Sequence, residues 1–424
     1  MHFKDISSFL GLDTDSFGPG IELNTQKALL KNKIVKLFLN EELKPPWLKE
    51  EYIRIYVPEV YEMNNQGKML GCFEFAGNKL PAITQMNNKI MLSFDPEETI
   101  RALLHEKYFK RKRPLYSYLP FHYHKIAGRV FLNRMQTKIK KRLNKGRFPS
   151  WPMEPSVEAL KYLILKLTNK KISGENFWPY NKKYAITLTH DVDTEKGFKN
   201  IPMLLKIEEK YNITSSWNIV GHSYKLEFKY IDNLVEQGHE IALHGFNHDN
   251  KLAYIKNEDI ELRFQKCLEL LQRYNIKGFR SPSLLRSDRL FGILPKYFQY
   301  DSSIPDTEIY SPIGNRNGCC SVFPFFINNL LELPLTIPQD AVLLNLGYSP
   351  EKIFSAWINK LNWIKSIGAL AVVNTHPDPH YSGNAKMSKL YEKFIETIVK
   401  DPNAWIANPY EIAKYWINNR NPRT

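Results

Sequence analysis

The stretch Ala185-Ile186-Thr187-Leu188-Thr189-His190-Asp191-Val192-Asp193 is the best indicator of the fold of this 424-residue chain. It is an apolar run of strand length that ends in polar side chains, and similar runs follow it with amphipathic helical stretches between them. This alternation predicts a parallel α/β arrangement, for which a closed or nearly closed barrel is the natural architecture. Strands are predicted at 185–189, 214–220, 240–243, 278–280, 300–302, 331–334 and 370–374, and helices at 201–211, 230–237, 259–274 and 355–367.

Two domains are expected. Residues 180–415 form the predicted α/β barrel, and residues 1–175 form an N-terminal accessory region of mixed α+β character. Within this region we predict strands at 52–57 and 90–94 and a helix at 97–104. A basic segment at 107–147 interleaves lysine and arginine with aromatic residues. It is either a solvated basic helix with packing aromatics or a contact for anionic lipid headgroups or an acidic glycan.

The composition fits a folded protein with an acidic partner. Hydrophobic residues make up 43% of the chain and charged residues 24%, so a sizeable core is expected. The 59 Lys and Arg against 44 Asp and Glu give a net charge of +15, which favours anionic lipid, polyanionic glycan or nucleic acid. Nucleic acid is not expected, because no zinc-finger, RNA-recognition or helix-turn-helix pattern accompanies the charge.

Cysteine usage and the N-terminus predict a cytoplasmic protein. Cys72, Cys267, Cys319 and Cys320 are too few to hold together a chain of this length and are interpreted as reduced thiols. The first residues carry an acid where a secretory signal would be apolar, and no run reaches the roughly 18 apolar residues of a membrane span. We therefore expect no signal peptide and no transmembrane helix, although a peripheral membrane contact remains open.

Two carboxylates and two imidazoles follow the predicted strands at positions that suit one divalent metal. Asp191 and Asp193 alternate on an extended strand end and share a face, so one could ligate metal while the other handles a proton. His244 and His248 follow the strand 240–243, in a spacing that brings both imidazoles to one ion on a helical turn or tight loop. Two histidines and one carboxylate leave positions open for water. The residues alone do not decide which aspartate is the ligand.

Further polar residues follow other predicted strands. Arg280 precedes a proline-restricted turn, where its guanidinium could orient a carboxylate. Asp301 and His376 each follow a strand. In barrels of this type the chemistry lies at the carboxyl ends of the strands, so these side chains are expected to converge. Three aromatic residues near the same strand ends are candidates for stacking on a sugar ring, namely Trp217, Phe246 and Tyr300.

Read in order, these motifs resemble those of the polysaccharide deacetylases with a NodB-type domain, a carbohydrate esterase group built on an irregular (β/α) barrel. The segments that carry the resemblance are Thr189-His190-Asp191-Val192-Asp193, His244 to His248, Phe279-Arg280-Ser281-Pro282, Tyr300-Asp301-Ser302 and Thr375-His376. The resemblance extends over residues 180 to about 415. It differs in that Val192 separates two aspartates that are adjacent in the family, and in that Ser283 and Ser302 replace aromatic residues.

The resemblance also implies a role for each residue. Asp191 would be the general base, Arg280 would position it, and Asp193, His244 and His248 would hold zinc or another divalent ion such as cobalt, nickel or manganese. His376 would be the general acid, with Asp301 tuning it. The chemistry is coherent, because a bound ion polarises an acyl carbonyl and lowers the pKa of water toward about 7, while a carboxylate and an imidazolium move the protons.

The leading hypothesis is a metal-dependent hydrolase that removes an acyl group, N-acetyl first, from a sugar in a polysaccharide or a lipid-linked glycan precursor. Two alternatives stay open: a hydrolase of a small non-sugar amide, and a catalytically silent glycan-binding module that uses the basic N-terminal region. An enzyme with a sugar substrate should have an open groove, whereas a small-amide enzyme should have a closed pocket.

Overall fold

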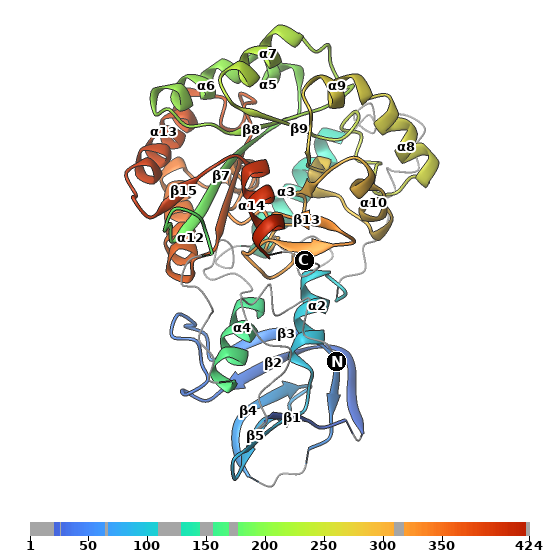
Figure 1. Cartoon of the computed structure of the whole chain (residues 1–424), viewed down its shortest axis with the longest axis vertical. Coiled ribbons are helices and arrows are strands. Elements are labelled where there is room, and N and C mark those ends of the chain that lie inside the picture. Colours follow the sequence, from blue (N-terminus) through green and yellow to red (C-terminus); the bar gives the residue numbers. More distant parts are fainter. Residues whose placement is uncertain are drawn as a thin grey trace.

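The computed structural model describes residues 21–25, 27–63, 67–108, 129–144, 156–168, 177–308 and 318–420. Figure 1 shows an α/β body at the top and a separate sheet at the bottom, with α2 (Pro96–Leu104) and α4 (Ser156–Leu167) between them. One sheet lies within residues 21–92 and the other within residues 184–406.

The upper body is an irregular (β/α) barrel, which confirms the predicted fold class. Its strands are β7 (Tyr184–Val192), β8 (Ser216–Ile219), β9 (Glu240–Leu243), β10 (Gly278–Phe279), β11 (Tyr300–Asp301), β12 (Phe325–Ile327), β13 (Leu330–Glu332), β14 (Leu370–Thr375) and β15 (Ala404–Ile406). The order is β12-β13-β11-β10-β9-β8-β7-β14, with β15 also on β7, and β12 pairs antiparallel while the other pairs are parallel.

The ring closes through irregular backbone. No described strand pairs β13 with β14, but Ile337 N donates to Val372 O at 3.0 Å and Thr336 Oγ1 donates to Leu370 O at 3.0 Å. The segment after β13 therefore takes the place of a strand. Inside, β7 and β14 are buried along their whole length, as expected for strands covered on both faces.

Helices surround this barrel (Figure 1). They are α5 (Glu195–Lys199), α6 (Ile201–Lys210), α7 (Phe228–Glu236), α8 (Asn257–Gln265), α9 (Leu268–Arg273), α10 (Asp288–Ile293), α11 (Asp340–Leu346), α12 (Pro350–Ile367), α13 (Ala385–Val399) and α14 (Pro409–Arg420). The predicted strands are all present, and three of the four predicted helices are present to within a few residues. The helix predicted at 259–274 is two helices, because the backbone at Cys267 leaves helical geometry (φ −96°, ψ 1°).

The N-terminal sheet consists of β1 (Ile21–Leu23), β2 (Ala28–Leu39), β3 (Tyr52–Tyr61), β4 (Lys68–Phe75), β5 (Asn78–Met86) and β6 (Lys89–Leu92), in the order β1-β6-β5-β4-β2-β3. The predicted strands at 52–57 and 90–94 correspond to β3 and β6. The predicted helix at 97–104 is α2, which begins after Asp95, whose carboxylate accepts from Glu97 N at 2.9 Å and Glu98 N at 3.1 Å.

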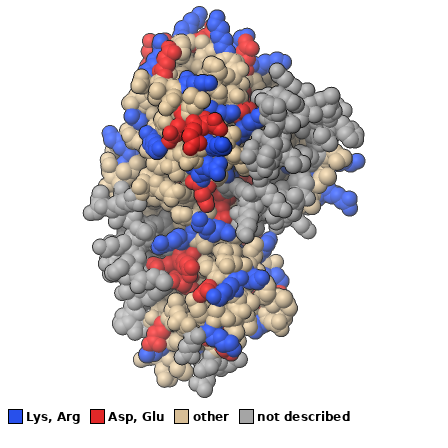
Figure 2. All heavy atoms as spheres, turned by 90° about the vertical axis from the view of Figure 1, so that its right-hand side faces the viewer, with Lys and Arg blue, Asp and Glu red and all other residues tan. Residues whose placement is uncertain are grey.

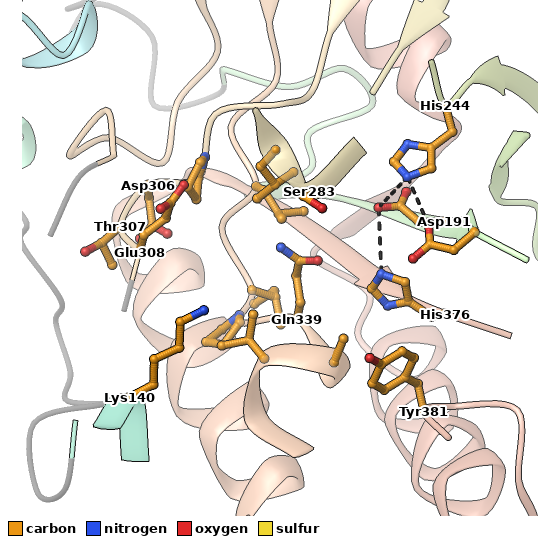
Figure 3. Close-up of a pocket in the computed structure, with 18 of the residues that line it drawn as sticks. Lys140, Asp191, His244, Ser283, Asp306, Thr307, Glu308, Gln339, His376 and Tyr381 are labelled. Atoms are coloured by element: carbon orange, nitrogen blue, oxygen red, sulfur yellow. Dashed lines mark hydrogen bonds and ion pairs between the residues drawn. The ribbon is translucent and has the colours of Figure 1, made fainter. Parts of the chain in front are cut away.

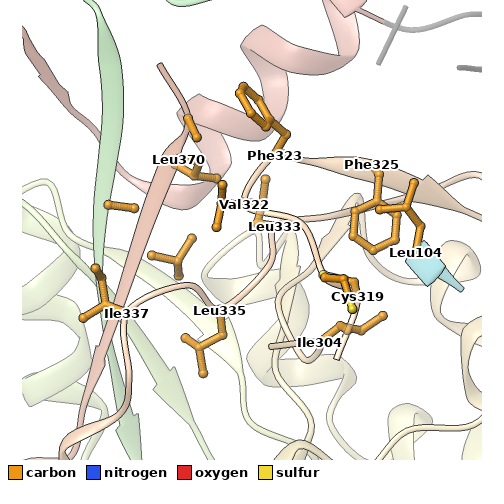
Figure 4. Close-up of a cluster of buried hydrophobic side chains, with 14 of the residues drawn as sticks. Leu104, Ile304, Cys319, Val322, Phe323, Phe325, Leu333, Leu335, Ile337 and Leu370 are labelled. Carbon is orange, nitrogen blue, oxygen red and sulfur yellow. The ribbon is translucent and has the colours of Figure 1, made fainter. Parts of the chain in front are cut away.

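The N-terminal region and the barrel share buried contacts. Leu104 of α2 lies beside Phe325 in a hydrophobic cluster that continues to Leu370 of β14 (Figure 4). Glu158 of α4 accepts from Ser321 Oγ at 2.8 Å, and Arg286 of the barrel donates to Glu106. The interface therefore combines apolar packing with buried ion pairs and hydrogen bonds.

Much of the predicted basic segment, 109–128 and 145–147, lies outside the described residues, so its proposed membrane contact stays a prediction. Its described part is α3 (Arg129–Asn144). On the face in Figure 2, Lys and Arg side chains alternate with Asp and Glu. No helix in the described ranges is both long enough and apolar enough to cross a bilayer. The four cysteines are free thiols, as predicted.

Candidate active site

A pocket of about 330 Å³ opens at the carboxyl ends of the barrel strands. It brings together Asp191, Asp193, His244, His248 and His376, which come from three strand ends. Figure 3 shows Asp191, His244 and His376 side by side. These residues were predicted to converge, and the structure places them around one cavity. Arg280, buried to 1% exposure, lies beneath it.

Three side chains form a group that could hold a metal ion. Asp193 Oδ1 lies 3.1 Å from His244 Nε2 and 3.2 Å from His248 Nε2, and one donor atom from each residue lies within 4.8 Å of the others. Burial opposes the charged carboxyl, but contact with the two imidazoles outweighs this and holds the pKa of Asp193 well below its usual range. An ionised carboxylate with two imidazole nitrogens fits zinc or a similar divalent ion.

His244 is oriented by the backbone of the neighbouring strand end. Its Nδ1 donates to Arg280 O at 3.0 Å, which leaves Nε2 directed toward Asp193. A metal-ligating histidine commonly has its second ring nitrogen fixed in this way. The arrangement therefore prepares the ring for an ion.

The loop between the two histidines requires a glycine. Gly245 has φ +67°, in the left-handed region, and a Cβ there would lie 2.7 Å from the Pro282 ring. His248 also has positive φ, at 51°. The His-x-x-x-His pair is thus carried by a tight loop and not by a helical turn.

Asp191 is held by two amides. Asn218 Nδ2 donates to its Oδ1 at 2.6 Å and Asn374 Nδ2 donates to its Oδ2 at 2.8 Å. The Nε2 atoms of His244 and His376 each lie 4.0 Å from Asp191 Oδ2. Burial disfavours the charge, but His244, Arg280 and His376 outweigh it and lower the pKa of Asp191. The carboxylate is therefore an ionised acceptor beside the metal-ligand group.

Arg280 has a less direct relation to Asp191 than predicted. Its Nη1 lies 3.8 Å from Asp191 Oδ2, while Nη2 donates to Ser302 Oγ at 3.0 Å and Thr189 Oγ1 at 3.3 Å. The hydrogen bonds that orient Asp191 come from the two asparagines, and the positive charge of the Arg280 guanidinium helps to lower the pKa of Asp191.

His376 is paired with Asp340 and not with Asp301. Its Nδ1 lies 2.7 Å from Asp340 Oδ1 and its backbone N donates to Asp340 Oδ2 at 2.9 Å. Burial disfavours the imidazolium, but the Asp340 carboxylate outweighs it and raises the pKa of His376 to about 10. The ring is therefore protonated at neutral pH, with Nε2 facing Asp191.

Asp301 was predicted to raise the pKa of His376, but the carboxylate in contact with His376 is that of Asp340. Asp301 accepts from Ser303 Oγ at 2.7 Å and lies in register with Glu332 on the next strand. Burial of these adjacent carboxyls raises the pKa of both. Asp301 is part of a buried structural pair behind the pocket.

The three predicted sugar-stacking residues also lie elsewhere. Trp217 is fully buried and stacks on His190 at 4.1 Å, and Tyr300, exposed to 1%, donates its hydroxyl to Glu240 at 2.6 Å. Phe246 stacks on His222 at 5.1 Å and is not among the lining residues. Among the described residues, the tyrosine that lines the pocket is Tyr381, whose ring centroid lies 5.3 Å from that of His376.

Sequence reasoning missed Asp340, Asn218, Asn374 and Tyr381. The two asparagines had a detectable signal, since each is a polar residue at the end of an apolar strand run, and Asn218 lies in register with Asp191. Asp340 follows no strand and begins a helix, so nothing local distinguishes it from an ordinary helix-start acid.

Comparison with known proteins supports the family resemblance. Residues 180–297 match the family model described as polysaccharide deacetylase. A peptidoglycan deacetylase from Helicobacter pylori is 26% identical over 254 residues, which cover 54% of this chain and 86% of that protein. A peptidoglycan deacetylase-like protein from Gibberella zeae is 34% identical over 127 residues, covering 27% of this chain and 36% of that protein. Among solved structures, the Puue allantoinase aligns with a TM-score of 0.47 and 16% identity, over 58% of this chain and 94% of that one. The family-model match to residues 180–297, together with the ordered motifs, supports the resemblance of this barrel to the polysaccharide deacetylases.

Proposed function

We propose that this chain is a metal-dependent hydrolase that removes N-acetyl groups from an amino sugar in a polysaccharide or a lipid-linked glycan precursor. The observation that carries the proposal is the juxtaposition, in one pocket, of a three-donor metal-ligand group, an ionised aspartate and a protonated histidine. A sugar substrate is supported by the names of the two curated relatives, both of which refer to peptidoglycan deacetylation.

Asp193, His244 and His248 would hold the ion. A divalent ion at this position would supply a Lewis acid for the acyl carbonyl oxygen and lower the pKa of an adjacent water. The ionised state of Asp193 and the fixed tautomer of His244 support this assignment, because metal ligands must be deprotonated at the ligating atom.

Two further side chains would move the protons. Asp191, kept ionised and oriented by Asn218 and Asn374, would accept the proton of the attacking water. His376, kept protonated by Asp340, would donate its Nε2 proton to the departing amine. The 4.0 Å between His376 Nε2 and Asp191 Oδ2 brings acid and base to the same reacting centre.

Two alanine substitutions test whether metal binding and proton donation belong to different histidines. His244→Ala removes a ligand and should lose bound metal and activity together. His376→Ala removes a proton donor, so it should retain metal while turnover falls by about 10²- to 10⁴-fold. The measurements are elemental analysis of purified protein and acetate release from N-acetylated oligosaccharides. The wild-type chain should carry close to one equivalent of divalent ion.

Asp191→Asn and Asp193→Asn are the matched pair for the two carboxylates. Only Asp193→Asn should empty the metal site, because Asp193 Oδ1 faces both imidazoles and Asp191 is held by amides. Metal loss in Asp191→Asn with metal retained in Asp193→Asn would reverse the roles. A wild-type protein with metal but no acetate release from any sugar would contradict the deacetylase proposal.

A further inference from the structure

One helix that precedes the barrel in sequence forms part of the wall of the catalytic pocket. Helix α3 contacts α11, the helix that begins at Asp340. Lys140 of α3 lines the pocket together with Gln339, Ala341 and Val342. In Figure 3 its amine points into the cavity from the side opposite Asp191 and His376. The pocket thus joins the catalytic residues with a side chain from outside the family-like barrel.

The acidic residues on that side of the pocket already have cationic partners. Asp306 forms a buried ion pair with Lys360, and Glu308 Oε1 accepts from Arg286 Nη1 at 3.0 Å. The side chains of Lys360 and Arg286 are each exposed to only 1%, so neither cation is available to a ligand in the pocket. Arg286 is shared with Glu106, so Glu308 is only partly neutralised, but neither Asp306 nor Glu308 forms an ion pair with Lys140 among the described residues.

Lys140 is different, because its amine has no hydrogen-bond or ion-pair partner within the described part of the chain. The side chain is half-buried and its residue lies among apolar groups, such as Val342, as well as the polar Gln339. In such a partly desolvated position an ammonium attracts an anion more strongly than it does in open water. The flexible four-carbon stem lets the charge reach a group at the pocket mouth.

We propose that Lys140 is a specificity-determining residue that binds an anionic substituent, a carboxylate or a phosphate, carried by the glycan close to the sugar that is deacetylated. The enzyme then prefers acidic glycans over neutral ones. This inference rests on the proposed deacetylase function, and it adds the chemical class of substrate and a role for the region before the barrel.

The test uses the full-length protein and matched oligosaccharides. The probes are a tetrasaccharide of alternating glucuronate and N-acetylglucosamine, the same tetrasaccharide as its methyl ester, and N-acetylglucosamine tetrasaccharides with and without a phosphate monoester. Binding is measured by calorimetry and turnover by acetate release. The probes form two pairs, each of one charged and one neutral oligosaccharide, and the wild type should bind the charged member more tightly in at least one pair. For that pair, Lys140→Met should bind the charged probe about five- to tenfold more weakly and the neutral probe as tightly as the wild type does. KM should rise with kcat retained, because the lost contact is present in ground and transition states alike.

Lys138→Met is the matched control, since Lys138 is exposed on the same helix and does not line the pocket. It should leave the ratio between charged and neutral probes unchanged, and Lys140→Arg should restore most of that ratio. If the ratio changes for the glucuronate pair, the anionic substituent is a carboxylate, and if it changes for the phosphate pair, the substituent is a phosphate. Equal affinity of the wild type for charged and neutral probes, or an equal loss in Lys138→Met, would overturn the proposal. Charge-dependent binding without acetate release would instead refute the deacetylase function and leave the anion site standing.

Discussion

Asp340 is the residue on which the protonation of the proposed acid catalyst depends. Its carboxylate contacts His376 Nδ1 at 2.7 Å and is held in turn by Ser382 Oγ at 2.6 Å. In Asp340→Asn the imidazole keeps a polar neighbour but loses the negative charge, so the pKa of His376 should fall. Since the acid acts only while protonated, the alkaline limb of the kcat/KM profile should move to lower pH. Acetate release measured as a function of pH checks this shift.

Asp301→Asn is the control for that experiment. Asp301 is bonded to Ser303 and lies beside Glu332, away from the imidazole. The substitution should therefore leave the alkaline limb in place, even if it alters stability. A shift produced by Asp301→Asn but not by Asp340→Asn would restore the pairing suggested by the family resemblance.

The sequence predicted several residues that line the pocket, but it misplaced their neighbours. Asp191, Asp193 and His376 follow apolar strand runs, and parallel strands present their carboxyl ends at one edge. The sequence predicts less clearly which side chains of a strand face the pocket. Trp217 lies in register with His190, while Asn218 lies in register with Asp191. Because side chains alternate along a strand, the indole points away from Asp191 and the Asn218 amide points toward it.

The loop between β9 and the second histidine is an element whose shape depends on one residue. In Gly245→Ala the backbone would have to hold an alanine at φ +67° and its Cβ at 2.7 Å from the Pro282 ring. Strain of about 1–3 kcal/mol is typical of such positions. We expect the loop to shift, His248 to leave its place beside Asp193, and the metal affinity to fall. Equilibrium dialysis against zinc measures this, with thermal unfolding in chelator as the stability readout.

Gly292→Ala serves as the matched substitution. Gly292 lies in α10, and a Cβ there would meet no atom within 4 Å. Helix propensity predicts a neutral or slightly stabilising effect, by up to about 1 kcal/mol. Metal affinity should be unchanged. If both variants bound zinc as the wild type does, the loop would not depend on glycine in the way described.

At the level of elements, the sequence predicted those with a strong local pattern. The barrel strands are continuous apolar runs, and β7 and β14 were predicted to within a few residues. By contrast, β2 has a mostly exposed central part and carries no such run. The closure of the barrel by residues 335–337 depends on hydrogen bonds to β14, over thirty residues away, and has no local signature.

For the whole molecule, the sequence predicted an N-terminal accessory region and a barrel, and it did not predict the contacts between them. The N-terminal sheet stands apart (Figure 1), while α3 lies on the barrel and supplies Lys140 to the pocket. Glu106, just after α2, reaches the barrel residue Arg286. Such long-range contacts between charged residues cannot be read from composition, because neither residue is distinguished by its sequence neighbours.

The buried pair of Glu106 and Arg286 should make the two regions unfold together. Arg286 donates from Nε to Glu106 Oε2 at 2.8 Å and from Nη2 to Oε1 at 2.5 Å, and both side chains are buried. Glu106→Gln leaves the guanidinium short of a counter-charge, and breaking a buried pair typically costs about 3–5 kcal/mol. Because Glu308 still contacts Arg286, we expect the lower end of that range in urea unfolding. Glu195→Gln, which removes an exposed pair with Lys199, should leave the free energy of unfolding almost unchanged, because solvent screens the pair. If the two substitutions had equal effects, the buried pair would not couple the regions. A second transition that appears only in Glu106→Gln would show that this contact makes their unfolding cooperative.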